Sequence, residues 1–224
     1  METGRSQPSR DLVIDLVEQL DVPLRERNAM LLAAGYAPVY RETPLETAQM
    51  TPVRQALDRL LGAHEPFPAV VTDRHWDLIS ANRPAQALLS QGVAPELRAP
   101  PINTLRVTLH PGGFAPRIVN FAEYSAHLME NLHRQAVLAA DPQLFELEKE
   151  LRGYPGVSET EKHDPMSELF VPMIFRASDD LELTFFSTLT TFGTALDITM
   201  AELTIEALFP ADAATAAAVR AVWG

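Results

Sequence analysis

The stretch LELTFFSTLTTFGTALDITMAELTIEALFPAD, residues 181–212, decides the fold class of this chain. It predicts two strands, Leu181–Phe192 and Leu196–Phe209, because β-branched and aromatic residues alternate with polar ones over both segments. Gly193 lies between them and marks a turn. The C-terminal third of the chain is therefore expected to contribute neighbouring strands to one sheet.

The alternation also assigns side chains to the faces of these strands. Phe185 and Phe186 are expected on opposite faces, since successive side chains of a strand point in opposite directions. In the second strand the apolar phase slips between Met200 and Leu203. We interpret this slip as a β-bulge.

Three further strands are expected upstream, and turn residues separate them from their neighbours. Their ranges are Ala69–Thr72, Trp76–Ser80 and Leu169–Arg176. Between the strands, Thr104–Leu109 is an apolar segment that we interpret as extended, ahead of a turn at His110-Pro111-Gly112-Gly113. Five strands joined by short turns or helices predict an α+β fold with an antiparallel sheet.

The remaining segments with apolar residues at intervals of three and four predict helices. Ser9 and Asn82 are expected to cap two of them, and Gly35 to end another. The predicted helices are 10–20, Leu24–Ala34, Thr51–Gly62, 83–89, Val119–Ala139, Pro142–Gly153 and Ala213–Val222.

The net charge of −12 is concentrated at one end of the sequence. Residues 141–224 hold fifteen acidic and five basic side chains, whereas acidic and basic residues nearly balance over residues 1–41. Nucleic acids and anionic lipids bind proteins through basic patches. The charge therefore argues against both kinds of partner for most of the chain.

Cysteine is absent, which excludes disulfides, thiolate metal sites and a cysteine nucleophile. The opening METGRSQPSRDL lacks the apolar stretch of a signal peptide, and the apolar run Met30–Tyr40 is too short to span a bilayer. We therefore expect a soluble cytoplasmic protein with no membrane partner.

The sequence offers no metal or cofactor motif. No two of its six histidines are three or four residues apart, and no phosphate-binding glycine loop or nucleophile elbow occurs. We interpret Asp197, Glu202 and Glu206 as a solvated acidic strand edge, in preference to carboxylate chemistry. No catalytic residue, metal ligand or cofactor is predicted.

Several stretches resemble the MmyB-like family of transcription regulators. Glu2–Leu45 is similar to the end of its XRE-type helix-turn-helix domain, and Ala69–Leu89, His110–Asn120 and Leu183–Asp212 resemble its ligand-binding domain. The resemblance implies a PAS-like five-stranded antiparallel sheet packed with helices, preceded by a residual all-α tail. It divides the chain into residues 1–45, a helix-turn-helix remnant, and residues 46–224, a ligand-binding domain.

The resemblance also bears on DNA binding. The chain begins where the recognition helix of the family should end, so we expect the first three helices to be missing. Arg5 matches a position near the DNA backbone, and specific DNA binding is expected only through a complete helix-turn-helix that is absent here. The family's paired half-sites further imply a homodimer.

In related proteins the PAS-like pocket takes a small, fatty-acid-like apolar effector. We expect this pocket between the sheet and the helix that begins near residue 119, with polar contacts at one end. Asn82 and His110 are each open to a structural role or a ligand contact. The predicted ligand-binding residues are Trp76, Asn103, His110, Phe121, Tyr124, Leu128, Phe175 and Phe185.

Two functions are compatible with these features. The first is a ligand-sensing transcription regulator whose pocket binds the effector and controls a DNA-binding module. The alternative is a ligand-free dimerisation or interaction module with a filled core. An enzyme is disfavoured, because the sequence contains no recognisable acid–base pair or cofactor loop.

Overall fold

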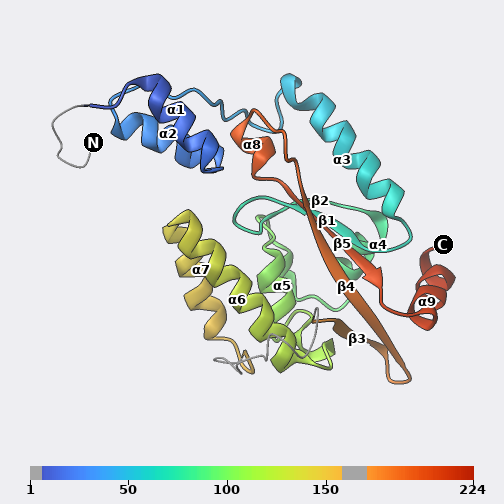
Figure 1. The fold of residues 1–224 in the computed structure, drawn as a ribbon. Coiled ribbons are helices and arrows are strands. Elements are labelled where there is room, and N and C mark those ends of the chain that lie inside the picture. Colours follow the sequence, from blue (N-terminus) through green and yellow to red (C-terminus); the bar gives the residue numbers. More distant parts are fainter. Residues whose placement is uncertain (1–6, 158–170) are drawn as a thin grey trace. The chain divides into compact units, whose positions relative to one another are not determined.

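The computed structural model describes residues 7–157 and 171–224, and Figure 1 shows how they are arranged. The predicted DNA contact Arg5 lies outside these residues. The fold is α+β, as the sequence predicts. The strands are β1 (Ala69–Thr72), β2 (Leu78–Ala81), β3 (Met173–Ser178), β4 (Leu181–Thr191) and β5 (Thr204–Pro210).

These strands form one five-stranded antiparallel sheet with the order β2-β1-β5-β4-β3. The C-terminal strand β5 therefore lies at the centre, where Val70 of β1 pairs with Glu206. On the other side of β5, β3 and β4 form a hairpin in which Met173 pairs with Phe185. Segments far apart in the sequence thus meet in the middle of the sheet.

The helices that the structure describes precede, connect and follow these strands. They are α1 (Arg10–Gln19), α2 (Leu24–Ala33), α3 (Thr51–His64), α4 (Arg83–Ser90), α5 (Thr104–Leu109), α6 (Phe121–Ala139), α7 (Pro142–Arg152), α8 (Ile198–Ala201) and α9 (Ala213–Trp223). Short 3-10 turns occur at Ala48–Met50, Pro95–Arg98 and Ala115–Arg117. No helix within the described residues is long and apolar enough to cross a membrane.

The chain divides into two compact units, residues 1–56 with 191–203, and residues 57–190 with 204–224. In the first unit α1 and α2 pack together around Val13, Val17 and Leu31, which are buried. In the same unit Arg25 of α2 forms an ion pair with Glu202, with Nε 2.7 Å from Oε1, and another with Glu42.

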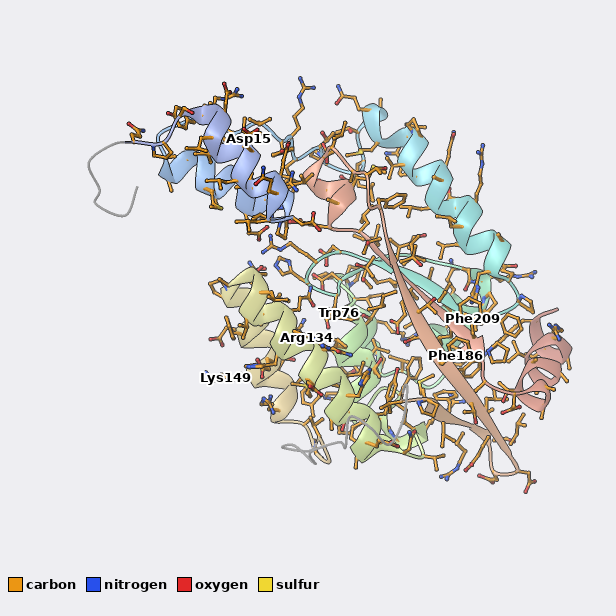
Figure 2. All side chains as sticks on the ribbon, in the orientation of Figure 1. Asp15, Trp76, Arg134, Lys149, Phe186 and Phe209 are labelled. Carbon is orange, nitrogen blue, oxygen red and sulfur yellow. The ribbon has the colours of Figure 1, made fainter. Side chains whose placement is uncertain are left out.

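The second unit contains the sheet and the helices α4 to α7 and α9. The antiparallel pair α6 and α7 buries a cluster with α5 that includes Leu109, Leu132 and Leu151 (Figure 1). On one face of the sheet, the rings of Phe186 and Phe209 stack at 5.4 Å (Figure 2). Because side chains alternate along a strand, Phe185 and Glu206 belong to the opposite face.

Two predicted elements were wrong. Thr104–Leu109 is helix α5, which Asn103 caps by accepting a hydrogen bond from the backbone N–H of Arg106 at 3.2 Å. Because this helix is buried on two sides, Leu105, Val107 and Leu109 are all buried. Their spacing of two residues is also the spacing of buried residues in a strand.

The predicted bulge between Met200 and Leu203 was also wrong, because the chain forms the one-turn helix α8 there. The Asp197 carboxylate caps α8 by accepting from the Thr199 N–H at 3.0 Å. It also accepts from the Thr43 hydroxyl at 2.6 Å. A helical turn shifts the phase of the apolar residues as a bulge would, so the two could not be distinguished from the pattern alone.

Candidate ligand-binding pocket

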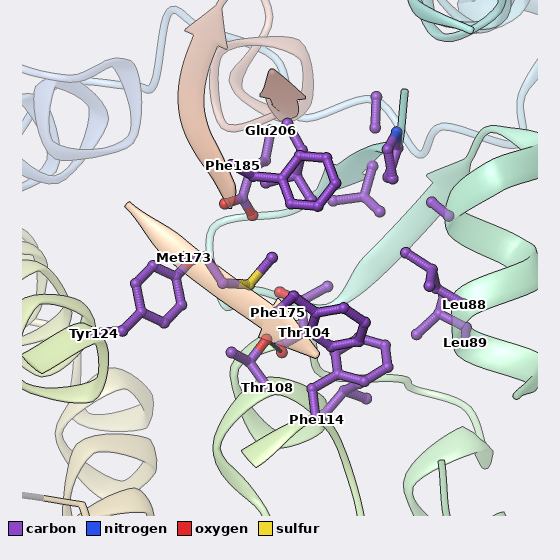
Figure 3. A pocket seen from close by; sticks show the side chains of 16 residues that line it. Leu88, Leu89, Thr104, Thr108, Phe114, Tyr124, Met173, Phe175, Phe185 and Glu206 are labelled. Carbon is purple, nitrogen blue, oxygen red and sulfur yellow. Dashed lines mark hydrogen bonds between the residues drawn. The ribbon is translucent and has the colours of Figure 1, made fainter. Parts of the chain in front are cut away.

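A mostly apolar pocket lies between one face of the sheet and the helices α4, α5 and α6 (Figure 3). Its volume is about 100 Å³, smaller than the engineered cavity of roughly 150 Å³ that binds benzene. A short or narrow ligand fits this space, and a longer one requires wall side chains to move. The lining residues are Pro68, Ala69, Val70, Ala85, Leu88, Leu89, Thr104, Val107, Thr108, Phe114, Tyr124, Met173, Phe175, Phe185, Glu206 and Leu208.

The sheet side of the pocket follows from strand register. Glu206 and Leu208 are two residues apart in β5 and so point to the same face. Across β5, Val70 is the partner of Glu206, and Phe185 is brought to the same face by β4. The hairpin register then adds Met173 beside Phe185.

The helical side depends on α5 and on the turn that follows it. Gly113 passes so close to α5 that a Cβ atom there would lie 2.0 Å from the Val107 carbonyl oxygen. The next residue, Phe114, donates its N–H to that same oxygen at 2.8 Å. Its ring meets the Phe175 ring edge-on at 5.6 Å, and the Arg117 guanidinium lies 4.3 Å from the centre of the Phe175 ring. This stack holds two aromatic walls of the pocket in place.

Four lining residues carry polar groups. The hydroxyls of Thr104 and Thr108 donate to the backbone carbonyls of Trp76 at 3.2 Å and Thr104 at 2.8 Å. Burial raises the pKa of the Glu206 carboxyl, and a hydrogen bond with Ser187 opposes this shift. Burial, with a smaller contribution from Glu206, also raises the pKa of Tyr124. Both groups are therefore uncharged more readily than in water.

The structure places three of the eight predicted ligand-binding residues in the wall of this pocket: Tyr124, Phe175 and Phe185. All three are at least nine-tenths buried. They were expected there because they are aromatic residues on the helix and strands that a PAS-like fold turns inward. Their contact with a ligand stays a prediction.

Three other predicted residues do not line the pocket. Trp76 lies in the β1–β2 turn with a φ of 67° instead of in β2, and its Nε1 donates to Gln135 of α6 at 2.8 Å (Figure 2). Phe121 and Leu128 pack between the α5–α7 cluster and the cluster around Ile118. Both therefore support the helix that carries Tyr124 without reaching the cavity.

The two predicted polar contacts also lie elsewhere. Asn103 caps α5 and donates to the His75 carbonyl at 2.8 Å, and it borders a separate open hollow of about 650 Å³. The His110 Nδ1 accepts from the Gly112 N–H at 2.9 Å, and its ring packs edge-on against Tyr154. Asn82 caps α4 by accepting from the Ala85 N–H at 3.2 Å. Asn103, His110 and Asn82 thus each form a hydrogen bond that holds the fold. For His110 and Asn82, this structural role is the simpler of the two roles considered.

The predicted acidic strand edge was wrong. Asp197 caps α8, Glu202 forms an ion pair with Arg25, and Glu206 lines the pocket from the central strand. The sequence carried one signal for Glu206: it alternates with the apolar residues Ile205 and Ala207 in a strand that contains no other charged residue. Strand order, which places β5 at the centre, was needed to interpret that signal.

Within the described part of the chain, no group of three His, Cys, Asp or Glu side chains could hold a metal ion. No curated protein matches this sequence. The family described as the MmyB-like transcription regulator ligand binding domain matches residues 53–222, a range that contains the whole sheet and the pocket. The chain therefore belongs to the MmyB-like transcription regulators, and residues 53–222 form their ligand-binding domain.

Proposed function

We propose that this protein senses a small apolar effector with a fatty-acid-like chain and transmits its binding to a helix-turn-helix module that reads DNA. One observation carries the proposal: within the family's ligand-binding domain, apolar side chains from sheet and helices enclose a cavity. Burial of the effector's chain supplies the affinity, at roughly 25 cal/mol per Å² of apolar surface. No catalytic step is part of this function.

The proposal predicts that filling the pocket abolishes binding. Ala85 of α4 is buried and lines the cavity, so Ala85→Leu adds three carbon atoms to a space of about 100 Å³. Native mass spectrometry should show that the purified wild type carries a bound mass or takes up six- to ten-carbon acids and alcohols. The Ala85→Leu variant should show neither.

Ala217→Leu is the matched control, since Ala217 is an exposed residue of α9 outside the pocket. This variant should bind as the wild type does. If Ala85→Leu bound the same compounds with unchanged affinity, the effector site would lie elsewhere. If the wild type bound none of them, the alternative of a ligand-free module would be favoured.

That alternative has an observation of its own. Leu12 and Leu16 of α1 and its C-cap residue Leu20 follow each other at four-residue intervals and are exposed. Val13 and Val17 are buried against α2. An exposed apolar row on a surface helix is typical of a contact between protein chains. We propose that it supports a homodimer, whether or not the pocket binds an effector.

A further inference from the structure

The Glu206 carboxyl is the exceptional group of the pocket. It projects from the central strand into a space whose other walls are mainly Phe, Leu, Met, Val and Ala side chains (Figure 3). No Lys, Arg or His side chain is among the lining residues that the structure describes. Glu206 is half-buried, and no cation in the described wall balances its charge when it is ionised.

Its surroundings make the Glu206 carboxyl easier to protonate than a carboxyl in water. Burial raises the pKa of Glu206, and the single hydrogen bond from Ser187 only partly compensates. A protonated carboxyl offers one O–H donor and one carbonyl acceptor. In either protonation state Glu206 can accept a hydrogen bond from a ligand hydroxyl, and in the protonated form it can also donate one.

Tyr124 supplies a second polar group from the opposite wall. It belongs to α6, exposes 6% of its surface, and lines the same cavity (Figure 3). Among the described residues, its hydroxyl has no hydrogen-bond partner, whereas the hydroxyls of Thr104 and Thr108 already donate to backbone carbonyls. This hydroxyl lines the cavity, so it is available to donate a hydrogen bond to a ligand there.

We propose that Glu206 determines the specificity of the pocket, which selects apolar ligands whose polar group is an uncharged hydroxyl. The Tyr124 O–H donates to the ligand oxygen, and the ligand O–H donates to the Glu206 carboxyl. This inference rests on the proposed function, because it names the head group of the same apolar effector.

Charged head groups are disfavoured for separate reasons. A carboxylate would meet the Glu206 carboxyl without any cation in the described wall to balance it, so binding would require an extra proton or bring two like charges together. An ammonium group could form an ion pair with Glu206. Burying that pair removes both ions from water, and their attraction offsets this cost only with further hydrogen bonds.

The test compares three ligands with the same six-carbon chain: 1-hexanol, hexanoate and hexylammonium. Isothermal titration calorimetry at pH 8 measures each against the wild type, Glu206→Gln and Tyr124→Phe. Glu146→Gln is the matched control, because Glu146 is an exposed residue of α7 outside the pocket.

The wild type and the control should bind 1-hexanol at least about tenfold more tightly than either ion. In Glu206→Gln the preference over hexanoate should fall below about threefold, since the amide N–H can donate to a carboxylate. Tyr124→Phe should weaken 1-hexanol binding about fivefold, through loss of one hydrogen bond.

Equal or tighter binding of either ion by the wild type would overturn the inference, and so would an unchanged preference in Glu206→Gln. Either result would leave the proposed function standing, because an apolar ligand would still be bound. If none of the three ligands binds the wild type, the proposed function fails as well. Should Glu206→Gln not fold, the wild-type ratio of 1-hexanol to hexanoate affinity decides the question.

Discussion

Asp141 joins the β1–β2 turn to the start of α7. Its carboxylate caps α7 by accepting from the Gln143 N–H at 2.9 Å, and it also accepts a hydrogen bond from Arg74 and lies 3.0 Å from the His75 Nε2. Burial alone would raise the pKa of Asp141, but these hydrogen bonds outweigh it and lower the pKa to about 2. The folded protein therefore holds Asp141 ionised well below the usual range.

This shift predicts acid sensitivity. A carboxyl whose pKa is depressed in the folded state stabilises the protein above its unfolded pKa, near 3.8, and loses that contribution as the pH falls towards 2. The shift corresponds to roughly 2 kcal/mol of unfolding free energy. Between pH 4 and pH 2, the free energy of unfolding should fall by about 2 kcal/mol more in the wild type than in Asp141→Asn. Urea unfolding at each pH measures this difference.

Asparagine can still cap α7, so this comparison isolates the charge. Asp180→Asn, at an exposed position in the β3–β4 turn, is the control and should follow the wild type. Parallel pH profiles for the wild type and Asp141→Asn would show that the Arg74 and His75 contacts contribute nothing that depends on ionisation.

Asp141 and Glu206 also show which residue roles could be predicted. Ser9 and Asn82 cap their helices as the sequence predicts, because a cap requires only residues within a few positions. The contact of Asp141 with Arg74 joins residues 67 positions apart, and the place of Glu206 in the pocket depends on strand pairing with Val70. Neither kind of partner can be identified from local pattern.

Two glycines, one in α3 and one in the turn after α5, have different surroundings. Gly113, in the turn after α5, stands against the Val107 carbonyl, which leaves no room for a side chain. Gly62 lies in α3, is exposed, and has no atom from beyond its own stretch of helix within 4 Å of the point that a Cβ would occupy. The same substitution should therefore have opposite effects at the two sites.

We predict that Gly113→Ala lowers the free energy of unfolding by about 3 kcal/mol, because the backbone around Val107 must shift. It should also weaken effector binding, since Phe114 would be displaced from the pocket wall. Gly62→Ala should raise the free energy of unfolding by roughly 0.5–1 kcal/mol, the usual gain in a helix interior. Chemical denaturation measures both changes. A Gly113→Ala variant as stable as the wild type would mean that this turn relaxes easily.

The whole molecule is expected to associate through α1. At about 50 µM the wild type should be a dimer by light scattering, and Leu16→Glu combined with Leu20→Glu should be a monomer, because the charges would enter the apolar contact. Leu138→Glu, at an exposed position of α6, is the control and should remain dimeric. A monomeric wild type would remove this prediction, and circular dichroism would verify that the variants are folded.

The sequence by itself determined the α+β class, the five strands, most of the helices, and the caps at Ser9 and Asn82. These features depend on residue period and on neighbours within one or two turns. Only the tertiary structure decided that Thr104–Leu109 is the helix α5 and that Asp197 starts α8, since burial on two sides and contacts with Thr43 act across the fold. It also decided the strand order β2-β1-β5-β4-β3, which places Glu206 in the apolar pocket. Strand order is set by pairing between segments far apart in the chain, and no local pattern records it.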